Sequence, residues 1–264
     1  MIKQLDETVI NKIAAGEVVE RPASAVKELI ENSIDAGCSD ITIEVADGGK
    51  TLIRVIDDGL GMSDIDLPIA LRRHATSKLP NNNLLNINSF GFRGEALPSL
   101  GAVGRLRIIS HNDGNGAHEI NVNGGKISDI KPAARTLGTT IELRDLFYAT
   151  PARLKFLRST KSELKAITDT VKGLSISTPN VAFTLIDKTG GKSRKIIQVQ
   201  KEKDVSLASI KNRLSRVLGQ DFSKNSISID VTREDVNLTG YVCLPTYARA
   251  SNAMQYFFVN NRQV

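Results

Sequence analysis

Three polar side chains between residues 22 and 35 have a spacing that could hold a water molecule beside a hard cation. Glu28, Asn32 and Asp35 fall on one stripe of a predicted helix, opposite its apolar face, at about 100° of rotation per residue. A carboxylate can take a proton from water, and an amide oxygen can bind a cation such as Mg²⁺. An ordinary solvent-exposed face is the alternative, although such faces usually mix charges and this stripe contains no Lys or Arg. On this helix alone both interpretations stay open.

A further acidic residue, Asp57, follows the predicted strand 52–56 and precedes the turn Gly59-Leu60-Gly61. Glycines in such a turn let the backbone approach a flat ligand closely, while the carboxylate accepts hydrogen bonds from the donor edge of that ligand. Asp-Gly pairs are also common in hairpin turns, so this motif is weak when taken alone.

Two other segments carry groups suited to phosphate. A glycine-containing turn precedes a predicted helix, and the backbone N–H groups at such a helix start form an anion site. Residues 72–90 are basic and rich in hydroxyl groups, as in a mobile lid over phosphates, with a plain surface loop as the alternative. The chain has neither the GxxxxGKS/T sequence of P-loop enzymes nor a GxGxxG after a strand. The turn residues are Gly91, Phe92, Arg93 and Gly94, and the lid residues expected at phosphate are Thr76, Ser77 and Lys78.

Charge is distributed unevenly along the chain. Residues 1–150 contain 16 Lys and Arg against 20 Asp and Glu, whereas residues 151–264 contain 19 against 9. A basic second half favours a polyanionic partner, with nucleic acid first, although solvated lysine-rich helices give the same count. The absence of Trp and the 5% aromatic content argue against a protein that reads single strands by base stacking. Candidate phosphate contacts are Arg153, Lys155, Arg158, Lys161 and Lys165.

Composition excludes several classes of protein. The 264 residues are 41% hydrophobic and 24% charged, which is ordinary for globular proteins and unlike disordered or fibrous chains. No apolar stretch approaches the roughly 20 residues of a membrane helix, and the N-terminal sequence has no apolar signal region. Cys38 and Cys243 are far apart and fit no metal spacing. We therefore expect a soluble cytoplasmic protein with no membrane partner.

Hydrophobic periodicity predicts an α+β fold with a mostly antiparallel sheet and helices on one face. The pattern predicts a helix over 22–35, stopped by Gly37, and then a hairpin of strands 41–45 and 52–56. A basic helical segment follows Pro151, and a longer helix is expected over 162–175. Further strands are expected at 105–110, 118–123, 126–130 and 139–144, with another hairpin over 181–200.

The polar run 201–204 predicts a boundary between a first domain, 1–200, and a second domain, 205–264. In the second domain we expect a helix at 205–218 and strands at 226–231, 236–243 and 255–260. About 60 residues is small for an independent core. We therefore expect this domain to be truncated at its C-terminal end.

Four motifs are similar, in order and spacing, to the ATP-site motifs of the GHKL superfamily of ATPases. Longer runs resemble the MutL/HexB family of DNA mismatch repair proteins, and the resemblance covers essentially the whole chain. The motifs are Glu28-x-x-x-Asn32-x-x-Asp35, Asp57-x-Gly59-x-Gly61, Gly91-Phe92-Arg93-Gly94 and Gly138-Thr139-Thr140, and the longer runs are 13–37, 72–79, 91–97 and 145–157. Two departures are Ala149, where the family usually has Asn, and an irregular stretch at 79–88.

The resemblance implies a Bergerat-type α/β sandwich that binds ATP with Mg²⁺, followed by a partial domain of ribosomal-protein-like fold. It assigns Glu28 as the general base and Asn32 as the Mg²⁺ ligand. It assigns Asp57 to the adenine amino group, with Thr139 assisting through water and Gly61 allowing close packing of the base. The glycine turn and the lid would contact the phosphates, and Asp35 would orient its neighbours.

The resemblance further implies a DNA clamp gated by nucleotide, in which ATP orders the lid and residues 1–20 and drives homodimer formation. Within residues 1–20, we expect Ile10, Ile13 and Val18 to lack core partners. The implied partners are double-stranded DNA, a mismatch-recognition protein and a downstream repair nuclease or helicase, in a nucleoid-associated location. The family's lysine for the γ-phosphate lies beyond residue 264, and no nuclease site falls in this region. We therefore expect ATP hydrolysis by this chain to be weak or absent.

Two alternatives to this ATPase clamp remain. The chain could only sense nucleotide and recruit partners, with hydrolysis incidental. It could also share the fold but belong with histidine kinases, type II topoisomerases or heat-shock chaperones. The three histidines lie in the lid or in predicted strands, and no tyrosine has the setting of a cleavage residue, which disfavours the first two of these.

Overall fold

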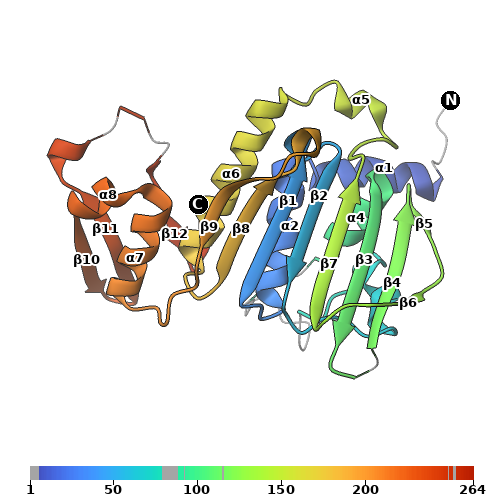
Figure 1. Ribbon diagram of the computed structural model, residues 1–264, viewed down its shortest axis with the longest axis horizontal. Helices are drawn as coiled ribbons and strands as arrows, with labels where there is room; N and C mark the ends of the chain where they lie inside the picture. Colours follow the sequence, from blue (N-terminus) through green and yellow to red (C-terminus); the bar gives the residue numbers. More distant parts are fainter. Residues whose placement is uncertain (1–5, 79–88, 92, 115, 249, 252–253) are drawn as a thin grey trace.

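A nine-stranded sheet forms the centre of the computed structural model, which describes residues 6–78, 89–91, 93–114, 116–248, 250–251 and 254–264 (Figure 1). The strands lie in the order β5-β4-β3-β7-β2-β1-β8-β9, and β6 pairs with β4. The pair β1–β8 is parallel, and the other pairs in this sheet are antiparallel. The mostly antiparallel sheet confirms the predicted α+β fold. The strands are β1 Asp40–Ala46, β2 Leu52–Asp57, β3 Arg105–Asn112, β4 Gly116–Asn123, β5 Lys126–Ile127, β6 Lys131–Ala133, β7 Gly138–Arg144, β8 Ala182–Asp187 and β9 Arg194–Val199.

Helices cover one face of this sheet, as the sequence predicts (Figure 1). Alternating residues of the strands point toward the helices, and Ile43, Ile53 and Ile108 on that face are fully buried. Among the described residues, no helix is long and apolar enough to cross a membrane. The helices on this side are α1 Glu7–Val18, α2 Pro22–Asp35, α4 Ala96–Val103 and α6 Thr160–Ser177, with the short helices α3 Asp66–Ala70 and α5 Pro151–Leu154 in the connections.

The opposite face of the sheet carries charged side chains that pair across neighbouring strands. Arg54 on β2 lies between Glu44 on β1 and Glu142 on β7, with N–O distances of 2.5 and 2.6 Å. Because the side-chain period of a strand is two, these charged positions alternate with the buried apolar ones. This alternation fixes the register in which Asp57 falls on the helix-facing side, at the end of β2.

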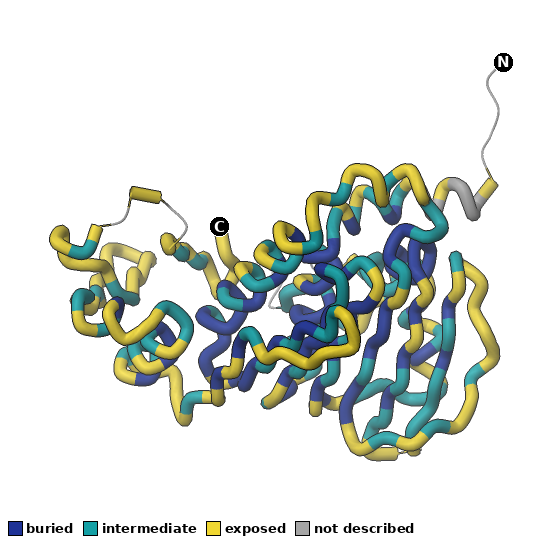
Figure 2. Tube along the Cα trace, turned by 45° about the horizontal axis from the view of Figure 1, so that its top comes forward, coloured by how far each residue is buried: buried dark blue, intermediate teal, exposed yellow. Residues whose placement is uncertain are grey.

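The last part of the chain forms a smaller group of elements beside α6 (Figure 1). The predicted helix and the first two predicted strands of this part are present, and Leu214 and Phe222 pack with Ile176 of α6 in a small apolar cluster. Figure 2 shows that burial is concentrated in the sheet and its helices, whereas this group is mainly exposed or intermediate. Its elements are α7 Leu207–Leu218, α8 Gln220–Lys224, β10 Ser226–Arg233, β11 Val236–Cys243, β12 Phe258–Val259 and β13 Arg262–Gln263.

Two predicted strands are shorter than expected. The strand expected at 126–130 ends at Ile127, because the Ser128 hydroxyl accepts from the amide of Asn121 at 3.1 Å in place of a ladder bond. The strand expected at 255–260 is only β12. Asn260 and Asn261 have φ angles of 49° and 65°, so the chain reverses there and pairs β12 with β13.

The N-terminal helix α1 differs in part from the sequence interpretation. We expected Ile10, Ile13 and Val18 to lack core partners, and Ile10 and Ile13 are indeed exposed. Val18, however, packs against the main core, because α1 lies across α4 and turns its last residues inward. The expectation was therefore wrong for Val18.

Candidate nucleotide-binding site

Helix α2 carries the predicted polar stripe next to the sheet. Pro22 occupies the first turn of the helix, where a missing N–H costs nothing, and Gly37 follows the last turn with a φ of 71°. Leu29 and Ile30 are fully buried against the sheet. The apolar face therefore fixes the rotation of the helix and directs Asn32 and Asp35 toward the loops at 76–78 and 89–91.

Lys78 neutralises this stripe from the loop that precedes the undescribed lid residues. Its ammonium lies 2.6 Å from Oδ2 of Asp35 and 2.7 Å from Oδ1 of Asn32. Asp35 also accepts from the backbone amides of Phe90 and Gly91, at 2.9 and 3.0 Å. One carboxylate thus holds the lid lysine and the start of the glycine turn together. Lys78 thus supplies, from elsewhere in the chain, the cation that the stripe itself lacks.

Asp57 is the last residue of β2, and its exposed fraction is 5%. Its Oδ2 accepts from the Ser33 hydroxyl at 2.8 Å, and its Oδ1 accepts from the amides of Gly59 and Thr139 at 3.0 and 3.2 Å. Burial raises the pKa of this carboxyl above its usual value, and these hydrogen bonds counteract part of the rise. A carboxylate has about four acceptor positions, so one remains available for a ligand N–H group.

Two buried serines, Ser33 and Ser110, lie in the polar network that contains Asp57 and Thr139, and the sequence analysis did not predict either of them. The buried Ser33 comes from α2, one residue after Asn32. The buried Ser110 comes from β3 and shares a 2.9 Å hydrogen bond with the hydroxyl of Thr139. Their signal in the sequence is weak, because a serine in a helix or a strand is usually exposed, and because Ser33 meets Asp57 and Ser110 meets Thr139 only in the folded chain.

Gly61 and Gly94 hold the two glycine turns against other backbone segments. Gly61 has a φ of 69°, and a Cβ there would lie 2.0 Å from the carbonyl oxygen of His111. Gly94 has a φ of 63°, and a Cβ there would lie 2.4 Å from the carbonyl oxygen of Ala75. Only glycine suits such a left-handed backbone with so close a contact. Gly94 thereby brings the loop at 75–78 onto the glycine turn.

Glu28 lies one turn before Asn32 on the same side of α2. Burial raises the pKa of its carboxyl, and the positive charges of Lys27, Lys78, Arg93 and Arg262 oppose that rise. The Glu28 carboxylate is therefore half-buried, and its burial favours uptake of a proton while the neighbouring positive charges disfavour it.

The structure brings most of the predicted site residues together and leaves some apart. The lid segment 79–88 and Phe92 lie outside the described residues. Thr76 and Ser77 are exposed, and the Thr76 hydroxyl accepts from the amide of Lys78 at 3.1 Å. Arg93 is also exposed, but its charge acts on the carboxyl of Glu28. The residues that converge are Glu28, Asn32, Asp57, Gly61, Lys78, Gly91, Gly94 and Thr139.

The chemistry of the site fits a divalent cation that arrives with phosphates. In the described part of the chain, no group of three or more His, Cys, Asp or Glu could hold a metal by itself. Mg²⁺ is commonly held by one or two protein oxygens together with substrate phosphates. The Oδ1 atom of Asn32 already has a cationic neighbour, the Lys78 ammonium, so it is placed to accept a positive charge.

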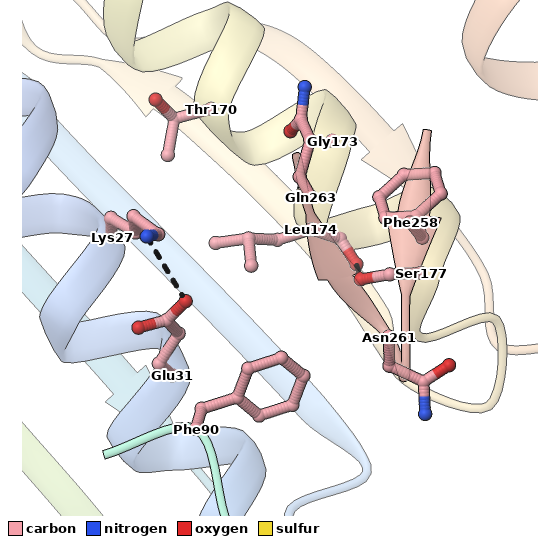
Figure 3. Close-up of a pocket in the computed structure, with 10 residues that line it drawn as sticks. All are labelled: Lys27, Glu31, Phe90, Thr170, Gly173, Leu174, Ser177, Phe258, Asn261 and Gln263. Carbon is pink, nitrogen blue, oxygen red and sulfur yellow. Dashed lines mark hydrogen bonds and ion pairs between the residues drawn. The ribbon is translucent and has the colours of Figure 1, made fainter. Parts of the chain in front are cut away.

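A small cavity lies on the outer side of the glycine turn, between α2, α6 and the β12–β13 hairpin (Figure 3). Glu31 and Lys27 form its α2 side and lie 3.6 Å apart as an ion pair. Phe90 forms the side nearest the turn. The segment before the turn is therefore in contact with the C-terminal hairpin as well as with α2.

The candidate DNA contacts divide into two kinds. Lys155, Arg158 and Lys161 are exposed along α5, the following loop and the start of α6. Lys165 is also exposed, and its ammonium lies 3.5 Å from Asp169. Arg153 differs, because its guanidinium packs so closely on Gly16 of α1 that a Cβ at Gly16 would overlap it.

Comparison with known proteins agrees with this geometry. Residues 20–137 match the family profile described as histidine kinase-, DNA gyrase B-, and HSP90-like ATPase. The fold is therefore that of the GHKL ATPases. Residues 214–264 match the family described as DNA mismatch repair protein, C-terminal domain. Over its whole length the chain is similar to the MutL family of DNA mismatch repair proteins.

Relatives and solved structures support this assignment. The DNA mismatch repair protein MutL of Allorhizobium ampelinum is 52% identical over 264 residues, which is 100% of this chain and 41% of that protein. The MutL of Paramagnetospirillum magneticum is 50% identical over the same length, which is 43% of that protein. The chain thus spans about two-fifths of the length of these relatives.

Two solved structures have the same arrangement of elements. The crystal structure of the N-terminal domain of a DNA repair protein has a TM-score of 0.81 and 25% identity, covering 97% of this chain and 78% of that chain. The Aquifex aeolicus MutL ATPase domain complexed with ADP has a TM-score of 0.71 and 26% identity, covering 94% and 84%.

Proposed function

We propose that this chain binds ATP with Mg²⁺ and hydrolyses it slowly, as the nucleotide-gated part of a DNA mismatch repair protein. The observation that carries the proposal is the buried carboxylate of Asp57, which has three protein donors and one acceptor position left. That position suits the amino group of adenine. The similar MutL ATPase domain from Aquifex aeolicus is described as a complex with ADP, which supports a nucleotide here.

The positions of the side chains support the remaining roles. Asp57 binds the adenine amino group, and Thr139, one strand away, orients a water at the same edge of the base. Asn32 holds Mg²⁺, which neutralises charge on the phosphates when bound. Glu28 accepts the proton of the attacking water, and its raised pKa makes it a better base than an exposed carboxylate. The turn from Gly91 to Gly94 donates backbone N–H groups to phosphate.

Lys78 is the residue that would change partners on nucleotide binding. It is paired with Asp35 and Asn32, and ATP offers its ammonium phosphate oxygens instead. Movement of Lys78 would carry the lid with it and order the N-terminal segment, as an order–disorder switch. Two chains would then join as a nucleotide-dependent homodimer around DNA. The exposed Ile10 and Ile13 of α1 support an added contact at this end.

We further propose that double-stranded DNA binds along the exposed basic residues of α5 and α6. The whole protein would link a mismatch-recognition protein to a downstream repair nuclease or helicase. Residues 1–200 would form the ATP-binding domain and residues 205–264 part of a transducer-like second domain. The small apolar cluster around Leu214 and Phe222 comes mainly from residues beyond 205, with Ile176 of α6 as its contact to the first domain, and this supports the division.

Calorimetry with ATP and Mg²⁺ tests the proposal, together with turnover by Glu28→Ala. We expect the unaltered chain to bind ATP with a Kd between about 1 μM and 1 mM. Glu28→Ala should lose measurable turnover and still bind ATP, because the base is needed only for the chemical step. An unaltered chain that binds no ATP would refute the proposal. A chain that binds ATP but whose slow turnover is unchanged in Glu28→Ala would refute the assignment of the base.

A further inference from the structure

The C-terminal hairpin reaches the nucleotide site through one arginine that none of the ATP-site motifs contains. Arg262 of β13 donates from Nη2 to the carbonyl oxygens of Ser89 and Phe90, at 2.7 and 2.9 Å. Its guanidinium carbon also lies 6.0 Å from the centroid of the Phe90 ring. Ser89 and Phe90 directly precede the glycine turn. Arg262 therefore binds the segment that leads into the proposed phosphate site.

The hairpin that carries Arg262 is seated on α6. Figure 3 shows Phe258, Asn261 and Gln263 on the hairpin side of the cavity, with Gln263 beside Gly173 of α6. Gly173 of α6 makes room for the hairpin, because a Cβ there would lie 2.1 Å from Oε1 of Gln263. The tight turn at Asn261 then places Arg262 beside Phe90. The position of Arg262 is thus fixed by α6 and by the turn between the two strands.

The segment Ser89–Gly91 is held from two sides. Asp35 of α2 accepts from the amides of Phe90 and Gly91, whereas Arg262 donates to the carbonyls of Ser89 and Phe90. Both polar groups of the Phe90 backbone are consequently bound to charged side chains. The orientation of these peptide units decides where the following N–H groups of the turn point. A change in the hydrogen bonds of Asp35 must therefore alter those of Arg262, and the reverse also holds.

The charge of Arg262 also acts on the stripe of α2. It opposes the effect of burial at Glu28 and at Glu31, and in both cases lowers a pKa that burial has raised. The hairpin therefore contributes a cation near the proposed general base as well as two hydrogen bonds to the segment before the turn.

We propose that Arg262 is a positioning residue that couples the nucleotide-binding turn to the β12–β13 hairpin. It fixes the peptide units before Gly91 in the orientation that phosphate needs, and it transmits occupation of the turn to the second part of the chain. The proposal rests on the proposed binding of nucleotide at this turn. Such coupling is reciprocal, so loss of the link must change both nucleotide affinity and the response of the hairpin.

The test measures two quantities on the 264-residue chain, with ADP and Mg²⁺ as the probe so that hydrolysis does not interfere. Calorimetry gives the affinity, and amide hydrogen exchange over residues 257–264 gives the response of the hairpin. We expect ADP to slow exchange there in the unaltered chain. Arg262→Ala should lose this response and bind ADP about three- to tenfold more weakly, which is the order expected when hydrogen bonds from an exposed cation are lost.

Two variants sharpen the comparison. Arg262→Lys keeps the charge but loses the fork of donors, so we expect an intermediate affinity and a partial exchange response. Arg233→Ala removes an exposed arginine from the end of β10 and should leave both measurements unchanged. Circular dichroism shows whether each variant is folded. If Arg262→Ala does not fold, Arg262→Lys decides, and values equal to those of the unaltered chain overturn the proposal.

The outcomes separate this proposal from the proposed function. Absence of ADP binding by the unaltered chain overturns both. ADP binding with no change in exchange at 257–264 overturns the coupling alone, and so does an unchanged response in Arg262→Ala. A higher ADP affinity in Arg262→Ala also overturns it, because the arginine would then oppose the binding geometry.

Discussion

The ammonium of Lys78 lies 2.7 Å from Oδ1 of Asn32, the same atom that we assign to Mg²⁺. A lysine and a divalent cation cannot share that position, because like charges repel strongly at such a distance. Binding of Mg²⁺ with nucleotide therefore requires Lys78 to move away from α2. The Asp35 carboxylate, 2.6 Å from the same ammonium, is the partner that it must also leave. If Asn32 binds Mg²⁺ as proposed, this exchange of one cation for another would couple metal binding to movement of Lys78.

Asn32→Ala should remove the contribution of Mg²⁺ to nucleotide affinity. We expect ADP to bind the unaltered chain at least about tenfold more tightly with Mg²⁺ than with a chelator, whereas the variant should show no such difference. Calorimetry under both conditions gives the comparison. Affinities in chelator should agree between the two chains within about twofold, because the amide then contributes only through Lys78. A full Mg²⁺ effect in the variant would show that another residue holds the metal.

Asp57→Asn should weaken nucleotide binding by about a hundredfold or more. The amide oxygen can still accept from Gly59 and Thr139, but the NH₂ group then presents a donor where the carboxylate offers an acceptor to the adenine amino group. The same carboxyl predicts a pH dependence. Its pKa is raised by burial, and the adenine amino group requires the ionised form. Affinity should therefore fall on acidification at a higher pH than for an ordinary carboxyl group.

The free energy of unfolding should depend on pH through Asp57 with the sign opposite to that of nucleotide affinity. An acid whose folded pKa is raised takes up a proton more readily when folded, so this group favours folding as the pH falls through that window. Denaturant titrations of the unaltered chain and of Asp57→Asn over the acidic range measure the difference. A nucleotide affinity that is flat over the same range would contradict the assignment of Asp57.

Gly61→Ala should destabilise the fold more than Gly37→Ala does. The two glycines have nearly equal φ angles of 69° and 71°, but a Cβ at Gly61 meets the His111 carbonyl at 2.0 Å, whereas nothing lies within 4 Å of one at Gly37. We expect about 1 kcal/mol for the left-handed backbone at Gly37 and about 3 kcal/mol or more at Gly61. Urea denaturation provides the two free energies of unfolding. Equal losses would mean that the loop at Gly61 moves aside freely.

Lys161→Ala should weaken binding to double-stranded DNA regardless of sequence and lower the salt dependence of binding by about one unit of log–log slope. Fluorescence anisotropy at several salt concentrations measures this slope. Lys126→Ala, on the exposed edge strand β5, serves as the control and should behave as the unaltered chain does. A slope that is the same in all three proteins would place the DNA elsewhere.

Arg153→Ala should instead lower thermal stability, because its guanidinium packs on α1.

Local patterns in the sequence predicted the parts of the fold that depend on neighbouring residues. The bounds of α2 match the prediction, since the apolar period and Pro22 lie within the helix and Gly37 follows its last turn. The place of Asp57 at the end of a strand followed from the apolar run before it and the glycines after it. The shortened strand before Asn260 was missed because its turn requires two asparagines with positive φ, which the apolar run conceals.

Contacts between distant residues could not be predicted in the same way. Ser33 and Asp57 meet because α2 lies against β2, and Lys78 reaches Asp35 only after the loop is placed by Gly94. Arg262 lies far along the chain from Ser89 and Phe90, and no spacing rule relates them. The motifs thus identified the residue types at the site, whereas the partners that orient them depend on tertiary packing.

The parallel pair β1–β8 has a consequence for how the chain folds. Asp40 pairs with Ala182, and Val45 pairs with Asp187, although the β1–β2 hairpin and its neighbours are complete much earlier in the sequence. On a ribosome, β1 is synthesised long before its second partner and presents a free edge until then. Contacts of such high sequence separation slow folding, and an open edge can pair with another chain. We therefore expect chains that stop before residue 182 to aggregate. Pairing of β8 with β1 is the step that covers the free edge of β1.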